Sequence, residues 1–244
     1  MWTSEKMGGI AALIGAATNI LGAVVYATLL VPKGFGSTNP DPSRIVALLA
    51  DNQSAMRLWY GIIYLVLGVC LIFLSLGLYE LLKAGSPALA RAVTIFGLIW
   101  AVLVIVVGTL SINDLSTVVR LYGENPGQAA TAWLTLDTVE TGLGAGGGET
   151  IVSALWFLLL GWTALQARAL PRVLSYLGVV TGVAGILSVL ALTDLTAVYA
   201  LGLIVGLAWL GIVMLRRSPV SAASRSATAR AIPDPGVHRV PQAH

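Results

Sequence analysis

Six long apolar segments, almost free of charge, divide the chain and decide what it can fold into. Because an α-helix rises about 1.5 Å per residue, roughly 20 apolar residues cross the ~30 Å hydrocarbon core of a bilayer. Inside that core the backbone must satisfy its own hydrogen bonds, so each segment must be helical. We therefore predict an all-α polytopic membrane protein, a bundle of six transmembrane helices. The predicted spans are residues 7–31, 58–82, 92–112, 150–165, 173–193 and 195–215.

The composition leaves room for one folded domain. Of the 244 residues, 57% are hydrophobic and 10% are charged, which is far from the average of a soluble protein. We expect the transmembrane domain to cover residues 1–217. Residues 218–244 are rich in Ser, Ala, Pro and Arg and bury too little apolar surface to fold, so we predict a disordered basic tail.

Basic residues predict the orientation of the bundle. Placing both termini in the cytoplasm puts ten of the 14 Lys and Arg residues inside and four outside, as the positive-inside rule requires. The four outer residues are Lys33, Arg44, Arg57 and Arg120. Most carboxylates then fall outside, so the outer face is predicted to be acidic.

Both long outer loops carry signals of a short helix. In residues 32–57, Asp41 suits an N-cap and Pro42 a first helical residue, with Ile45 and Leu49 on one face. A second helix is expected after Pro126, over an apolar run that Asp137 and Glu140 break. It is too short and too charged to be a seventh span, so we expect an interfacial helix or a cap over the outer mouth. The third span is expected to continue past the bilayer through Val118 and Tyr122.

Asn19 lies in the middle of the first predicted span. An amide in hydrocarbon needs a partner, so we expect Asn19 to face protein on a stripe with Gly8, Gly15 and Gly22. Two interpretations stay open. Either the amide forms an interhelical hydrogen bond in a packing face, or it lines a buried cavity.

Charged residues at the outer ends of the spans form the main candidate site. Asp114 and Glu149 together with Arg57 and Arg120 could make an acidic vestibule, and Tyr64 in the second span is expected to point inward. The alternative is that these are solvated helix ends, with Glu149 placed favourably at a helix N-terminus. Glu149 is the strongest candidate. It precedes the shortest span, which reaches full length only if the glycines at 146–148 also enter the bilayer.

No catalytic constellation is visible. The only histidines are His238 and His244, in the predicted tail, and the only cysteine, Cys70, lies within an apolar span. We therefore expect no enzymatic activity, no metal site and no cofactor, and no nucleic-acid partner.

Glycines mark faces where helices can approach closely. Gly178 and Gly182 in the fifth span, and Gly202 and Gly206 in the sixth, keep the small-xxx-small spacing. Since only a tight turn around Asp194 joins these spans, we predict that they pack as an antiparallel hairpin.

The fourth and fifth spans contain a set of short motifs: Gly147-Gly148-Glu149-Thr150-Ile151-Val152, Leu155-Trp156, Leu170-Pro171-Arg172, Tyr176-Leu177-Gly178 and Gly182. In these motifs the chain resembles a widespread family of small bacterial six-pass membrane proteins that carries only a domain-of-unknown-function label, family 4386. The resemblance implies a six-helix bundle in a bacterial plasma membrane and brings no known substrate or catalytic residue.

Two functions from different classes fit these observations. The first is a non-enzymatic protein that binds or passes a small lipophilic or cationic ligand from the outer side. The second is a structural or accessory subunit that packs against itself or a partner membrane protein through glycine-rich faces. A polar cavity reaching Asn19 and Glu149 would favour the first.

Overall fold

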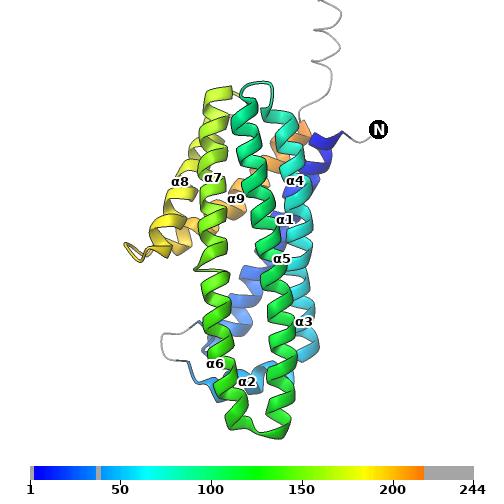
Figure 1. Ribbon diagram of the computed structural model, residues 1–244, viewed down its shortest axis with the longest axis vertical. Helices are drawn as coiled ribbons and strands as arrows, with labels where there is room; N and C mark the ends of the chain where they lie inside the picture. Colours follow the sequence, from blue (N-terminus) through cyan, green and yellow to red (C-terminus); the bar gives the residue numbers. More distant parts are fainter. Residues whose placement is uncertain (1–2, 37–39, 217–244) are drawn as a thin grey trace, which may run out of the picture.

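The computed structural model describes residues 3–36 and 40–216, so the predicted basic tail at 218–244 lies outside the described residues. Within them the chain is helical and contains no strand. Figure 1 shows an elongated bundle with the long α5 running its whole length. The helices are α1 (Ser4–Val25), α2 (Pro42–Asp51), α3 (Gln53–Tyr60), α4 (Leu67–Leu82), α5 (Pro87–Glu124), α6 (Pro126–Leu143), α7 (Gly148–Ala167), α8 (Arg172–Val189) and α9 (Thr196–Arg216).

In the described part of the chain, six helical segments are long and apolar enough to cross a membrane, and they correspond in order to the six predicted spans. The fifth segment ends at Val189, four residues before the predicted end, and the sixth begins at Thr196, one residue after the predicted start. On α5 the outward face is apolar and exposed from Ile95 to Val106, as expected for contact with lipid. From Thr109 to Arg120 the same face is polar. The chain is therefore a multi-pass membrane protein, and the edge of its apolar belt crosses α5 between Val106 and Thr109.

The part of the bundle beyond this edge forms a second folded layer, which we call the cap. The cap consists of α2, α3, α6 and residues 109–124 of α5, and it occupies the lower part of Figure 1. It has its own apolar core, separate from that of the membrane bundle. The core is built from Leu30, Ile45, Val46, Leu49, Met56, Tyr60, Leu115, Val118, Ala129 and Trp133.

The first cap helix forms as its sequence predicts. The Asp41 carboxylate accepts hydrogen bonds from the backbone N–H groups of Ser43 and Arg44, at 3.0 and 3.3 Å, and caps α2. Pro42 is the first helical residue, where its missing N–H costs nothing. Ile45 and Leu49 are buried in the cap core.

The second cap helix is longer than expected and stands upright. Helix α6 begins at Pro126, with Asn125 as its N-cap, and continues to Leu143 through Asp137 and Glu140. It packs alongside α5, along the length of the bundle, and α7 continues above it in Figure 1. The expectation of an interfacial helix is wrong, because one face of α6 has a partner in the extension of α5.

Helix α7 is long enough to cross the membrane because it includes the last glycine of the run that precedes the predicted span. It starts at Gly148 and has 20 residues, so Gly148 and Glu149 belong to its first turn. Gly146 takes φ +106°, a left-handed conformation that favours glycine, and its N–H donates to Thr150 Oγ1 at 2.9 Å. This short link separates α6 from α7.

The predicted glycine faces are filled inside the chain. A Cβ on Gly202 would meet Thr181 of α8, as expected for an antiparallel α8–α9 hairpin. Gly178 and Gly182, however, lie against the backbone of α7, and Gly206 lies against Phe157 of the same helix. Helix α7 therefore takes up much of the small-residue surface that the sequence assigned to the α8–α9 contact.

Candidate functional site

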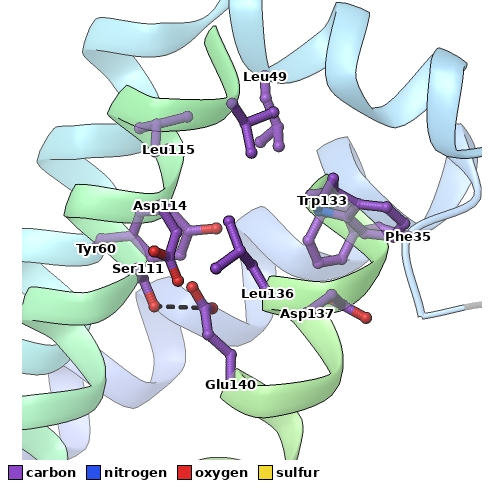
Figure 2. Close-up of a pocket in the computed structure, with 11 residues that line it drawn as sticks. Phe35, Leu49, Tyr60, Ser111, Asp114, Leu115, Trp133, Leu136, Asp137 and Glu140 are labelled. Atoms are coloured by element: carbon purple, nitrogen blue, oxygen red, sulfur yellow. Dashed lines mark hydrogen bonds between the residues drawn. The ribbon is translucent and has the colours of Figure 1, made fainter. Parts of the chain in front are cut away.

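A small pocket lies inside the cap, between α5 and α6, and has a free volume of about 20 Å³. That is room for about one water molecule or a small group of a ligand. Apolar and aromatic side chains form much of its wall (Figure 2). Its lining residues are Phe35, Leu49, Tyr60, Ser111, Asp114, Leu115, Val118, Trp133, Leu136, Asp137 and Glu140.

Carboxyl groups from two helices meet in this pocket. Asp114 of α5 and Glu140 of α6 point toward one another, whereas the Asp137 carboxyl points away from the pair (Figure 2). Ser111 Oγ lies 3.0 Å from Glu140 Oε2 and holds this side chain against α5. The two facing carboxylates repel each other when both are ionised, so a proton or a cation between them stabilises the arrangement.

Among the described residues, no basic side chain forms an ion pair with a pocket carboxylate. The ion pairs of the described residues are Lys83–Glu80 and Arg120–Glu124, and neither involves a pocket carboxylate. The described part of the chain also brings together no three His, Cys, Asp or Glu residues that could hold a metal ion. The pocket therefore offers uncompensated negative charge beside aromatic rings, without the ligand set of a chelated metal.

The aromatic wall comes from separate segments. Phe35, at the end of the segment that follows α1, makes an edge contact with Trp133 of α6, with ring centroids 6.0 Å apart. Tyr60, the last residue of α3, is almost fully buried and stacks on Tyr64 at 6.2 Å. Aromatic faces beside a carboxylate are typical of sites for organic cations.

Glu149 lies deeper, inside the apolar belt. Its Oε1 accepts a hydrogen bond from Trp100 Nε1 of α5 at 3.3 Å. Trp100 comes six residues before Val106 on α5. The Trp100–Glu149 pair therefore lies about 9 Å inside the edge of the apolar belt. Oε2 of Glu149 is fully enclosed and has no hydrogen-bond partner among the described residues.

Where the cap joins the membrane bundle, several segments depart from regular α-helix. One π-helical turn, Tyr26–Leu30, follows α1, and another, Gly61–Val66, joins α3 to α4. The second turn places Tyr64 against Gly108 of α5, and the α6–α7 link places Gly144 against Val107. π-Helical turns are frequent at functional sites.

The predicted arginine partners do not reach Glu149. Arg57 donates to Ser116 Oγ at 3.1 Å, and Arg120 pairs with Glu124 at 3.2 Å. These contacts lie 16 and 20 residues along α5 from Trp100, or about 24 and 30 Å away. The sequence analysis grouped Arg57 and Arg120 with Glu149 at the same end of the molecule. In the structure, a long stretch of α5 separates the two arginines from Glu149.

Asn19 bonds within its own helix. Its Nδ2 donates to the Gly15 carbonyl at 2.8 Å, and the side chain is partly buried. The stripe around it packs as a glycine face should, since Gly15 lies against Leu67 and Gly22 against Ile63. Asn19 does not line the cap pocket.

Of the predicted site residues, only Asp114 lies in the cap pocket, and sequence reasoning missed its main partner. Glu140 was interpreted only as a charge that ends an apolar run. The helical spacing held a signal, because Trp133, Leu136, Asp137 and Glu140 follow i, i+3, i+4 and i+7 on one face. Ser111, Asp114 and Leu115 repeat part of that pattern on α5.

Comparisons with known proteins identify the chain by family alone. No curated protein and no solved structure matches it. The family model described as Domain of unknown function (DUF4386) matches residues 7–217, which is most of the chain and all six membrane-spanning segments. The chain therefore belongs to this family of unknown function.

Proposed function

We propose that this protein is a non-enzymatic membrane protein that binds a small organic cation from the outer side, in the cap pocket. The observation that carries the proposal is the facing pair Asp114 and Glu140, which forms no ion pair with any basic residue in the part of the chain that the structure describes. Phe35, Trp133 and Tyr60 supply the aromatic surface that suits an ammonium group. The pocket volume limits the buried part of the ligand to a small group.

The proposed orientation places the cap outside the cell. The end of the bundle opposite the cap carries Lys6, Lys83, Arg91, Arg168, Arg172 and Arg216, whereas the cap end carries four basic residues. The positive-inside rule assigns the first end to the cytoplasm. The cap pocket then faces the exterior of what we propose is a bacterial plasma membrane.

Glycine packing gives less support to the accessory-subunit alternative. Gly9 and Gly211 lie against each other's helices, and Gly161 and Gly182 lie at the α7–α8 contact. These faces serve contacts inside the chain, so they are not free to dock another membrane protein.

A binding experiment tests the proposal. Purified protein is titrated with methylammonium chloride by calorimetry, with sodium chloride as the arm that tests for a simple inorganic cation. We expect saturable methylammonium binding that is weakened at least about tenfold by Asp114→Asn or Glu140→Gln, since each removes one of the two charges that face the ligand.

Glu124→Gln is the matched control for these variants. It makes the same chemical change at an exposed residue whose partner is Arg120, outside the pocket, so binding should be unaffected. The absence of methylammonium binding to the wild type would contradict the proposal, as would equal binding by the wild type and both pocket variants. Binding of sodium alone would replace the organic cation with an inorganic one.

A further inference from the structure

Glu149 has a carboxylate oxygen that nothing in the fold accounts for. Trp100 Nε1 bonds Oε1, but Oε2 is enclosed and has no partner among the described residues. A helix N-terminus explains a carboxylate at an exposed first turn, but not one whose second oxygen is shut away from water. An enclosed carboxylate needs a cation, a network of donors or a proton.

The surroundings of Glu149 supply neither a cation nor a full donor network. The titratable groups near enough to Glu149 to sense its charge are Tyr64, from the turn before α4, and Tyr199, from α9, and neither is basic. Helix α5 contributes the indole of Trp100, and the Tyr199 hydroxyl is already bonded to Ser153 Oγ at 2.5 Å. No ion pair of the described residues involves Glu149.

Tyr64 lies between the surroundings of Glu149 and the cap pocket. Its side chain packs against both the membrane-bundle core and the cap core, and its ring stacks on Tyr60, which lines the pocket. Glu140 and Glu149 are nine residues apart in the chain, on α6 and α7, with only the short link at 144–147 between the two helices. In a medium of low dielectric constant, the electrostatic field of a charge at one carboxyl group extends to the other.

We propose that Glu149 holds a proton and that a cation binding in the cap pocket releases it. The O–H bond of the Glu149 carboxyl breaks, its electron pair stays on the carboxylate, and the proton passes to water on the cap side. The entering cation replaces the positive charge that leaves, so the net charge of the protein is unchanged. The release of the proton by a cation rests on the proposed cation-binding function. The protonation of Glu149 does not depend on that function.

Infrared spectroscopy of the solubilised full chain tests both parts. A protonated carboxyl group has a C=O band well separated from the carboxylate bands, and we expect one at neutral pH that Glu149→Gln removes. Trp100→Phe should shift the frequency of this band, because it deletes the N–H donor at Oε1 while Glu149 remains. Glu124→Gln, the same change at an exposed site, should leave the band intact.

The release of the proton on cation binding is measured from the intensity of the same infrared band during a methylammonium titration. We expect the Glu149 band to lose intensity as the cation binds, and to persist unchanged in Glu140→Gln. If no band depends on Glu149 at neutral pH, the proton assignment is wrong. If methylammonium binds the wild type while the band stays constant, the linkage is wrong although the binding function stands. If methylammonium does not bind at all, the binding function fails, and with it the linkage, while the band still decides the protonation of Glu149.

Discussion

Single glycines in this chain decide how closely helices approach. Gly77 of α4 faces α1, and an added Cβ would lie 2.8 Å from the Ser4 carbonyl oxygen and 3.0 Å from Gly8 Cα. Both are backbone atoms, which cannot move aside as a side chain can. Asn19 shows the opposite case, since its amide bonds its own helix and not a neighbour. Packing at this scale depends on backbone contacts more than on interhelical hydrogen bonds.

We therefore expect Gly77→Ala to lower the stability of the solubilised protein, because α1 and α4 must separate to admit the methyl group. The matched control is Gly123→Ala near the end of α5, where no atom lies within 4 Å of the added Cβ. There the helix propensity of alanine should raise the stability by up to ~1 kcal/mol. Thermal unfolding in detergent measures both. A Gly77→Ala protein that unfolds at or above the wild-type temperature would contradict the backbone contact.

The sequence predicted residues that act locally and missed those that act across helices. Asp41 was identified as an N-cap because the signal lies within three residues of the chain. The Glu140–Asp114 pair depends on α6 standing upright against α5, which no local pattern specifies. Arg57 and Arg120 were grouped with Glu149 because all lie at the same end of their spans. The distance along α5 could not be judged before its length beyond the bilayer was known.

Among the elements, α6 and α7 depend most on their connection. The link between them brings Gly147 against the end of α6, where an added Cβ would lie 2.0 Å from the Gly142 carbonyl oxygen and 2.5 Å from the Gly142 carbonyl carbon. One residue later, a Cβ on Gly148 would lie 3.4 Å from the Leu143 carbonyl oxygen and 3.9 Å from that of Gly142, both ordinary contacts. From the sequence, the glycines at 146–148 were expected to lengthen a short span. The structure shows that the glycine run also determines how α6 is placed relative to α7.

Gly147→Ala is expected to disrupt this link, and Gly148→Ala to leave it intact. The first substitution must push α6 away from α7 and loosen the cap, which exposes the apolar core around Trp133. Limited proteolysis of the solubilised protein should then cut the 125–147 region of Gly147→Ala faster than that of the wild type. Equal cleavage of the two variants would show that the link tolerates a side chain and that the cap is anchored elsewhere.

For the whole molecule, the hydrophobic pattern predicted six crossings because burial in lipid leaves a helix as the only choice for each segment. The same hydrophobic pattern does not predict the cap. Its helices are amphipathic, short or charged, and they fold because α5 extends far enough to give them a surface. The cap core and the pocket within it are products of that tertiary arrangement, and the pocket carboxylates stand at the contact that creates it.

The orientation of this two-layer molecule is the last prediction. Six crossings place Ser4 and Arg216 at the same end, and the α4–α5 turn at Ser86 lies there too. Of the ten basic residues that the structure describes, six lie at that end and four at the cap end, so the positive-inside rule assigns the first end to the cytoplasm and Glu124, in the cap, to the exterior. A cysteine at Glu124 should react with a membrane-impermeant thiol reagent in intact cells, whereas one at Ser86 should react only after the cells are opened. The native Cys70 is buried, so the unmodified chain supplies the unlabelled background. Labelling at position 86 alone in intact cells would reverse the orientation and place the cap pocket in the cytoplasm. The cation of the proposed function would then bind from inside the cell.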